Sequence, residues 1–235
     1  MASSAHPVTI ISLGGSLIAP PTGPDPKFLS KFRDLILKLS RKGQRFVIIC
    51  GGGAICRQYQ AAAKKTGPLT PTELDWLGIH VTRLNANFLK SIFRKAAHPE
   101  IVTDPSLAPV DSTAKIIIGA GYEPGCSTDT DAILMAKKFG ASTVVNLSNV
   151  TFVYNADPRT NPEAKPFKKL TWKEFRKMFG GTTWKPGLNR PFDPVAAKMA
   201  EAEKMRVIIT DGGNLKNVEK ALSGESFRGT EITPS

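Results

Sequence analysis

The stretch VIICGGGAICR, residues 47–57, decides how the rest of the chain is interpreted. Its β-branched apolar run is typical of a buried strand, and the alanine-rich segment after the glycines, up to Lys65, predicts a helix that ends before Gly67. Three glycines at a strand-to-helix turn leave backbone N–H groups open to a phosphate, with the helix N-terminus behind them. Arg57, one turn into the helix, can add a bidentate contact to the same anion.

On its own, this stretch is also compatible with a plain tight turn followed by a surface arginine. It matches neither G-x-G-x-x-G nor G-x-x-x-x-G-K-[ST], so it supports neither a Rossmann dinucleotide site nor a P-loop. The interpretation therefore depends on what the other strands of the chain lead to.

Three more predicted strands end in glycines. Residues 8–13 lead to Gly14-Gly15-Ser16, residues 115–118 to a glycine-rich segment from Gly119, and residues 207–210 to Asp211-Gly212-Gly213. Helical segments separate the strands, which predicts an α/β fold with a largely parallel sheet and helices on both faces. Because parallel strands end at one edge, where ligands bind, the four glycine turns near residues 14, 52, 121 and 212 predict a site for several phosphates.

Capping residues mark most of the predicted helix starts. They are Asp25-Pro26, the capping box Thr70–Glu73, the capping box Thr171–Glu174 and Asp193-Pro194. A further helix is expected from near Thr128, with Ser127, Thr128 and Asp129 crowded at its N-terminus, and a last helix at residues 215–222. The helix after Thr70 is expected to continue to about Ala97, with a break at Gly78. Further strands are expected at residues 101–102, 143–147 and, at a sheet edge, 230–232. The loop from Gly180 to Arg190 is expected to be mobile.

Three acidic residues near helix starts have two interpretations each. Asp75 is either a favourable charge near a helix dipole or an acceptor for substrate hydroxyl groups. Asp129 and Asp131 either cap the helix that begins near Thr128 or take part in a site. The sequence leaves both interpretations open.

Composition excludes several classes of protein. With 235 residues and 41% hydrophobic content, the chain can form one large α/β domain or two lobes that share a sheet. Its three cysteines, Cys50, Cys56 and Cys126, lack metal-ligand spacing, which predicts a reduced, cytoplasmic protein. No apolar run approaches 18 residues, and no basic region precedes an apolar stretch at the N-terminus, so neither a membrane span nor a signal peptide is expected.

The formal net charge of +12 raises the question of nucleic-acid binding. The basic residues are spread through the predicted helices without a run of five, so small anionic substrates explain the charge as well, and no nucleic-acid partner is expected. His6, His80 and His98 lack the spacing of a nucleophilic constellation and are expected to be structural or exposed.

Taken in order, the motifs of this chain resemble those of the amino-acid-kinase superfamily, and within it the archaeal-type uridylate (UMP) kinases. The matching residues are Leu13-Gly14-Gly15-Ser16, Gly51-Gly52-Gly53 with Arg57 and Tyr59, Asp75–Ile79, Thr82–Ala86, Pro124–Asp129, Asn149-Val150, Val153-Tyr154, Ala156-Asp157-Pro158, Phe192–Lys198 and Gly229-Thr230. The resemblance runs nearly end to end, and its specificity comes from the order and spacing of these motifs together.

The resemblance implies a fold, an activity and partners. The fold would be a three-layer αβα sandwich in a single domain, residues 1–235, with an acceptor lobe over about residues 1–147 and an ATP-binding lobe over about 148–235. The activity would be ATP- and Mg²⁺-dependent transfer of the γ-phosphoryl group to UMP, giving UDP, in pyrimidine nucleotide synthesis. The family also implies a homo-oligomer, such as a hexamer, with no membrane partner.

The resemblance further implies roles for individual residues, with none of them expected to form a metal site. Gly14, Gly15 and Ser16 would face the ATP phosphates, and Asn149, Tyr154, Asp157 and Pro158 would form the adenosine side. Gly52, Gly53 and Arg57 would hold the UMP phosphate, Asp75 would accept the ribose hydroxyls, and Gly121, Gly125, Ser127 and Thr128 would belong to a loop closing over uracil and ribose. Catalytic positions would be Gly15, Ser16, Asp193 and Asp129, the last in the transfer region near the metal.

Two departures from the family pattern leave alternatives open. Ser12 stands where most members have lysine, and Thr151-Phe152 replaces the usual Asp-Gly, so Phe152 either reshapes the base pocket or packs into the core. Asp193 replaces a second lysine of the acid-phosphorylating relatives, which favours a nucleotide kinase, and no histidine lies near Gly51–Arg57, unlike in isopentenyl phosphate kinases. The alternatives are a kinase of another small phosphate or acid, and a nucleotide- or oxyanion-binding relative that has lost transfer activity.

Overall fold

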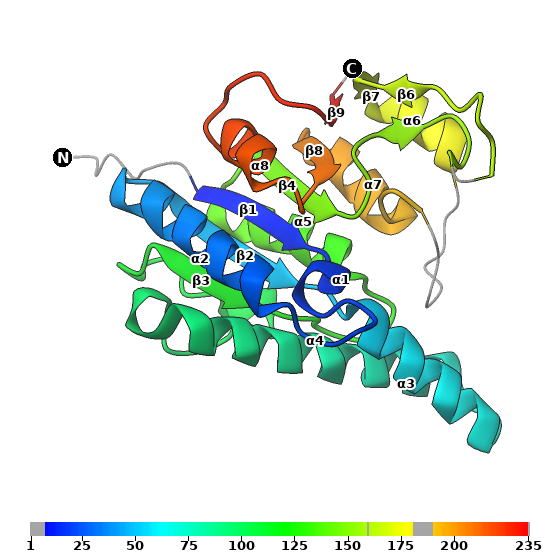
Figure 1. The fold of residues 1–235 in the computed structure, drawn as a ribbon, viewed down its shortest axis with the longest axis horizontal. Coiled ribbons are helices and arrows are strands. Elements are labelled where there is room, and N and C mark those ends of the chain that lie inside the picture. Colours follow the sequence, from blue (N-terminus) through cyan, green and yellow to red (C-terminus); the bar gives the residue numbers. More distant parts are fainter. Residues whose placement is uncertain (1–7, 159, 181–189, 235) are drawn as a thin grey trace.

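A seven-stranded sheet forms the centre of the computed structural model, which describes residues 8–158, 160–180 and 190–234 (Figure 1). The strand order is β3-β2-β1-β4-β8-β9-β7, and the strands span β1 (Val8–Leu13), β2 (Arg45–Cys50), β3 (Ile116–Gly119), β4 (Thr143–Ser148), β7 (Lys169–Thr171), β8 (Arg206–Asp211) and β9 (Thr230–Thr233). A separate pair, β5 (Val153–Tyr154) and β6 (Pro166–Phe167), runs antiparallel.

The first five strands of this order are parallel, as the alternation of strands and helices predicts. The expected edge position of residues 230–232 is wrong. β9 lies between β8, to which it is antiparallel, and β7, with which it is parallel. Sequence reasoning missed this because β7 contains only three residues and has no apolar run of its own.

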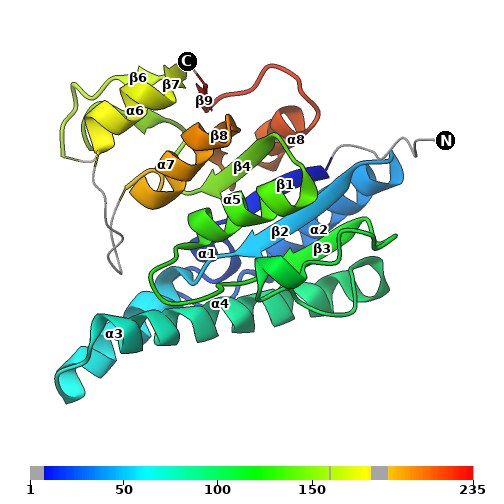
Figure 2. The same ribbon diagram turned by 180° about the vertical axis from the view of Figure 1, so that it is seen from behind.

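Helices cover both faces of the sheet and make the three-layer sandwich (Figures 1 and 2). One face carries α2 (Pro26–Arg41), α4 (Pro71–Phe93) and α8 (Leu215–Leu222), and the other carries α5 (Thr128–Phe139), α6 (Trp172–Phe179) and α7 (Pro194–Ala202). Strand alternation separates the two cores, since Ile10 of β1 packs with the α5 layer and Ile11 with the α2 layer. Two short 3₁₀ turns, η1 (Arg94–Ala96) and η2 (Pro105–Leu107), lie between α4 and β3 in the chain.

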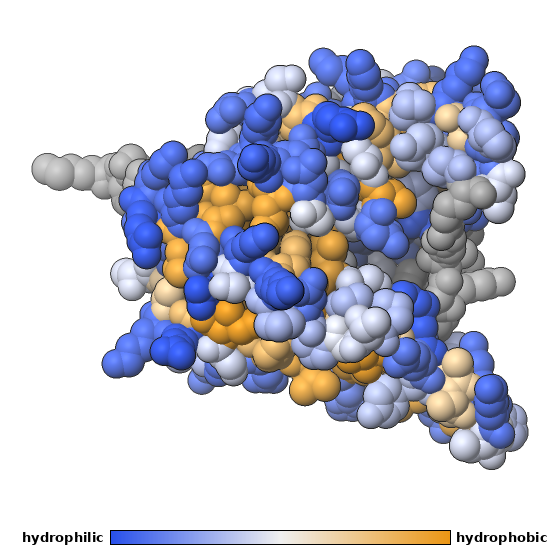
Figure 3. All heavy atoms as spheres, viewed as in Figure 1, coloured by the Kyte–Doolittle hydropathy of each residue, from blue (hydrophilic) through white to orange (hydrophobic). Residues whose placement is uncertain are grey.

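Two helices lie at the carboxyl ends of the strands, α1 (Gly15–Ile18) and α3 (Gly53–Thr66). Only Ala54 of α3 is buried, and the far end of this helix stands clear of the body at the lower right of Figure 3. The same view shows charged and polar side chains over most of the molecular face, with apolar side chains between them. None of the helices in the described ranges has the length and apolar character that crossing a membrane requires.

The capping signals of the sequence are confirmed. Thr70 with Glu73 and Thr171 with Glu174 form complete capping boxes. Asp25 and Asp193 cap α2 and α7, each before a proline in the first turn. The cap of α5 is Ser127, which accepts from the Thr130 N–H group and which sequence reasoning did not name as the cap. Capping by Asp129 or Asp131, one of their two interpretations, is therefore wrong, which leaves both carboxyl groups for other contacts.

Three expectations about the middle of the chain are wrong. Helix α4 passes through Gly78 without a break, because buried Leu74, Ile79 and Val81 on either side hold it against the protein, and packing outweighs the weak helix propensity of glycine. The helix also ends at Phe93 rather than near Ala97, since Arg94 has a φ of 52°. Residues 101–102 form no strand, and only Val102 makes an isolated bridge, to Gly119.

Other expectations fall on residues outside the described ranges. These are the N-terminal segment that contains His6 and most of the loop from Gly180 to Arg190. The described histidines match the expectation: His80 is exposed and stacks on Trp76, and the Nδ1 atom of His98 lies 3.1 Å from the carbonyl oxygen of Glu100.

The glycine turns after β1 and β2 lie in direct backbone contact. A Cβ atom added to Gly15 would lie 2.3 Å from both the Gly51 carbonyl oxygen and the Gly53 nitrogen. Gly53 also has a φ of +67°, which favours glycine independently of the available space. Side chains are thus excluded from both turns, and the N-termini of α1 and α3 are brought together.

Substituting Gly15 by alanine tests this contact. Because the obstructing atoms are backbone, Gly15→Ala should lower the free energy of unfolding by about 1–3 kcal/mol or more, measured by urea denaturation. Gly67→Ala is the matched control, since nothing lies within 4 Å of a Cβ atom there. Equal midpoints for Gly15→Ala and the unsubstituted chain would contradict the close approach.

Candidate active site

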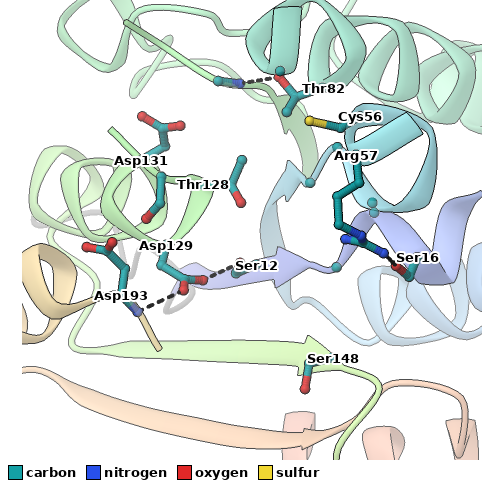
Figure 4. Close-up of a pocket in the computed structure, with 18 of the residues that line it drawn as sticks. Ser12, Ser16, Cys56, Arg57, Thr82, Thr128, Asp129, Asp131, Ser148 and Asp193 are labelled. Atoms are coloured by element: carbon teal, nitrogen blue, oxygen red, sulfur yellow. Dashed lines mark hydrogen bonds between the residues drawn. The ribbon is translucent and has the colours of Figure 1, made fainter. Parts of the chain in front are cut away.

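A cavity of about 570 Å³ opens at the carboxyl ends of β1, β2, β3 and β4 (Figure 4). Three of the glycine turns line it through Gly14, Gly15, Gly51, Gly52, Gly53 and Gly121. The fourth turn lies at the same edge of the sheet, but Gly212 is not part of the cavity wall. A Cβ atom at Gly212 would meet the Leu17 side chain at 2.3 Å, so this turn packs against α1 and does not add to a phosphate site.

Arg57 of α3 connects the two turns that touch. Its Nη2 atom donates to the Ser16 hydroxyl oxygen at 3.2 Å, and both residues line the cavity (Figure 4). A guanidinium has five N–H donors, so this bond leaves donors for an anion. The expected phosphate ligands Gly52, Gly53 and Arg57 therefore face the same space as Gly14, Gly15 and Ser16.

A hydrogen-bonded cluster around Asp129 forms another wall. Ser12 Oγ and Asn146 Nδ2 both donate to Asp129 Oδ1, at 3.1 and 2.8 Å, and the backbone N–H of Asp193 donates to Oδ2 at 3.2 Å. Strand register explains the meeting, because Ser12 of β1 pairs with Asn146 of β4 and both side chains face α5. Sequence reasoning missed Asn146, although its place two residues after buried Val144 on the same strand face was a usable signal.

Burial raises the pKa values of the carboxyl groups in this wall. Asp129 is half-buried as a residue, but protein atoms surround its carboxyl group closely. This burial, and to a smaller extent the nearby Asp193 carboxylate, raises the pKa of Asp129 to about 7. Burial also raises the pKa of Asp193, whose Oδ1 accepts from the Ala196 N–H at 2.8 Å. Within the described ranges, Asp193 Oδ2 has no hydrogen-bond partner.

Helix α4 holds the loop between β3 and α5 over the cavity. The backbone N–H of Gly125 donates to Asp75 Oδ2 at 2.9 Å, and that of Gly121 donates to Thr82 Oγ1 at 2.8 Å. Arg83 donates to the carbonyl oxygens of Gly121 and Tyr122, at 3.4 and 3.1 Å. Ser127, Thr128 and Asp75 line the cavity with Gly121. Gly125 does not line it, but its N–H group is hydrogen-bonded to Asp75, which does.

Of the residues expected on the adenosine side, only Asn149 lines the cavity. Tyr154, Asp157 and Pro158 lie outside its wall, in and after β5. Phe152 is half-buried and contacts the Tyr154 ring edge-on, with centroids 6.3 Å apart, and it belongs to neither apolar core. The Thr151-Phe152 departure therefore changes the surface next to Asn149 rather than the packing of the sheet.

Asn85 is a further site residue that sequence reasoning named only as part of a motif. Its side chain is buried on α4, and Nδ2 donates to the Gly51 carbonyl oxygen at 2.7 Å. This bond fixes the orientation of the peptide after Gly51, and with it the turn that leads into α3. A polar residue on the apolar face of a long helix was the available signal.

Comparison with known proteins identifies the family of this chain. The model of the Amino acid kinase family matches residues 7–211. The chain belongs to this family. A uridylate kinase from Methanococcoides burtonii is 34% identical over 225 residues, which are 95% of this chain and 94% of the relative.

Solved structures of other family members share the fold. A uridylate kinase from Archaeoglobus fulgidus aligns with a TM-score of 0.80 and 28% identity, covering 96% of this chain and 99% of its own. A UMP kinase from Bacillus anthracis has the same TM-score of 0.80 at 20% identity, covering 97% of this chain and 96% of its own, and that likeness shows the fold alone.

The raised pKa of Asp129 predicts a pH-dependent stability. Because the carboxyl group stays protonated to higher pH in the folded chain than in the unfolded chain, folding takes up a proton between about pH 4 and pH 7, and unfolding releases it. The free energy of unfolding should therefore fall as pH rises through that window, by at most about 1.4 kcal/mol per pH unit for one proton. Urea titrations at several pH values measure the slope.

Asp129→Asn separates this group from the others, since an amide does not titrate. The variant should show a flatter dependence between about pH 4 and pH 7 than the unsubstituted chain. An unchanged slope would mean that Asp129 is ionised in the folded protein throughout the window.

Proposed function

We propose that this chain transfers the γ-phosphoryl group of ATP to UMP, giving UDP. The observation that carries the proposal is the contact between two glycine turns in one cavity, with Arg57 donating from the second turn to Ser16 of the first. Two such turns at helix N-termini provide two anion sites side by side, as a reaction between two nucleotide phosphates requires. Relatives and solved structures named uridylate kinase over nearly the full chain support UMP as the acceptor.

In this proposal the two turns have different partners. Gly52, Gly53 and Arg57 hold the UMP phosphate, while Gly14, Gly15 and Ser16 hold the ATP phosphates. Asp75 accepts the ribose hydroxyls of UMP, and the loop that contains Gly121, Gly125, Ser127 and Thr128 covers ribose and uracil. The first lobe, about residues 1–147, thus binds the acceptor, and the second, about 148–235, binds adenosine through Asn149, Tyr154, Asp157 and Pro158.

The proposed reaction requires the two substrates to be positioned in line and needs no catalytic base. A UMP phosphate oxygen forms the new bond to the γ-phosphorus while the bond from that phosphorus to the β–γ bridging oxygen breaks. The attacking phosphate, with a second pKa of about 6, is already ionised at neutral pH. Backbone N–H groups and Arg57 stabilise the negative charge of the transferring group, and holding both reactants in line contributes about 7–11 kcal/mol in favourable cases.

Magnesium completes the charge balance of the proposed reaction. Among residues 8–158, 160–180 and 190–234, no three His, Cys, Asp or Glu side chains group closely enough to hold a metal ion. Mg²⁺ needs no such cage, because it keeps several waters and binds through substrate phosphates with one or two protein groups at most. The ion would supply charge neutralisation on the ATP phosphates. A hexameric assembly, a cytoplasmic location and a role in pyrimidine nucleotide synthesis belong to the same proposal.

The direct test is an assay of ADP release by the purified chain with ATP, Mg²⁺ and a panel of nucleoside monophosphates and small acids. UMP should give the highest kcat/KM, with UDP as product. If a small acid or another phosphate compound gave a higher kcat/KM, that compound rather than UMP would be the acceptor. Binding of both ATP and UMP without turnover would show that transfer has been lost.

Arg57→Ala tests the acceptor phosphate site. Loss of a charge-assisted hydrogen bond costs about 1.5–3 kcal/mol, so the Kd of UMP should rise about 10- to 150-fold in calorimetric titrations, while ATP affinity changes little. Lys64→Ala, on the same helix but away from the cavity, is the control and should bind UMP normally. If Arg57→Ala bound UMP with unchanged affinity, the acceptor phosphate would have to bind at another turn.

A further inference from the structure

Asp131 is a buried acidic residue for which the proposed phosphate transfer has no use. It lies in the first turn of α5, is only 1% exposed and nevertheless lines the cavity. Neither carboxyl oxygen has a hydrogen-bond partner within the described ranges. A buried polar group without a partner is costly, so the group points to a ligand that supplies one.

The groups around Asp131 do not supply hydrogen bonds to its carboxyl oxygens. Burial raises its pKa to about 8, against the opposing effect of the nearby Tyr122 backbone N–H, which is close but not in hydrogen-bond geometry. Asp129 and Glu123 add negative charge on this side. Arg83 is the nearby cation, but its guanidinium donates to the carbonyl oxygens of Gly121 and Tyr122 and lies over the Trp76 ring.

The position of Asp131 in the cavity indicates which part of a ligand it meets. In Figure 4 Asp131 and Arg57 lie on opposite sides of the cavity, and Ser12 donates to Asp129 rather than to Asp131. Asp131 is close to the loop that begins at Gly121, which α4 holds through Thr82 and Arg83. A nucleoside monophosphate with its phosphate at Arg57 and its ribose at Asp75 would direct its base toward this loop.

We propose that Asp131 binds the base of the acceptor nucleotide, accepting a hydrogen bond from the N3–H group of uracil. This inference rests on the proposed function, because it takes UMP as the acceptor. A carboxyl oxygen accepts from N3–H in either protonation state, and a protonated carboxyl group can also donate to the adjacent O4 atom. Asp131 would thus determine base specificity, whereas Arg57 and Asp75 hold parts that all nucleoside monophosphates share.

The test compares UMP with ribose 5-phosphate, which has the same phosphate and sugar hydroxyls but no base. Isothermal titration calorimetry gives the Kd of each ligand for the unsubstituted chain, Asp131→Ala and Asp131→Asn. Asp131→Ala should bind UMP about tenfold more weakly and ribose 5-phosphate unchanged. Asp131→Asn should keep UMP affinity within about threefold, because an amide also presents an acceptor beside a donor.

Two controls exclude a purely structural effect. Removing an unpartnered buried carboxyl group should leave the melting temperature of Asp131→Ala unchanged or raised. Asp111→Asn, which removes an exposed carboxylate away from the cavity, should leave both Kd values unchanged and so exclude an effect of net charge.

The outcomes separate this inference from the proposed function. If the unsubstituted chain binds no UMP, the proposed function and the role of Asp131 are both wrong. If it binds UMP and Asp131→Ala binds UMP equally well, only the role of Asp131 is wrong. Equal weakening of UMP and ribose 5-phosphate by Asp131→Ala would likewise overturn it, because the base would then not be the group that Asp131 contacts.

Discussion

The site depends on one steric constraint, the backbone contact between Gly15 and the turn Gly51–Gly53. No side chain fits between them, so the carboxyl ends of β1 and β2 and the N-termini of α1 and α3 meet as bare backbone. Asn85 donates to the Gly51 carbonyl oxygen from α4, which fixes the orientation of that peptide. The arrangement brings two sets of N–H groups together before any ligand binds, and this preorganisation is what a transfer between two anions requires.

The second feature is an acidic wall beside Ser12, the position at which the family resemblance implies a lysine. Ser12 reaches Asp129 with a neutral hydrogen bond, and Asn146 supplies a second one from the neighbouring strand. These neutral donors, with the Asp193 backbone N–H, hold the carboxyl group in place. In the proposed reaction, the absence of a lysine at this position would leave charge neutralisation of the donor phosphates more strongly dependent on a bound cation and on the backbone amides of the turns.

The sequence predicted the fold where local signals and the hydrophobic pattern agreed. Capping boxes and prolines located α4, α6 and α7, and apolar runs located the five parallel strands, because each signal acts within a few residues. It failed where long-range packing decided the outcome. Gly78 does not break α4, and β9 lies between β8 and a strand too short to show a pattern. Distant partners could not be inferred from local spacing.

The candidate site shows the same division. The glycine turns and Arg57 were predictable, since backbone access and a helix N-terminus are local properties. The Gly212 turn lies at the predicted edge, but Leu17 closes it, which no pattern around residue 212 indicates. Asn146 and Asp131 face the cavity through strand register and helix packing, so their part in the site was decided only by the fold. Asp131 shows this most clearly, because its sequence context equally suggests a helix cap.

The most direct measurement is calorimetric binding of a molecule in which a chain of phosphates joins uridine to adenosine, replacing UMP and ATP together. If the two turns hold the acceptor and donor phosphates in one cavity, one such molecule should bind per chain, exclude both UMP and ATP, and bind at least about 100-fold more tightly than either. If UMP or ATP still binds to the complex, the phosphates do not meet in this cavity and the account is wrong.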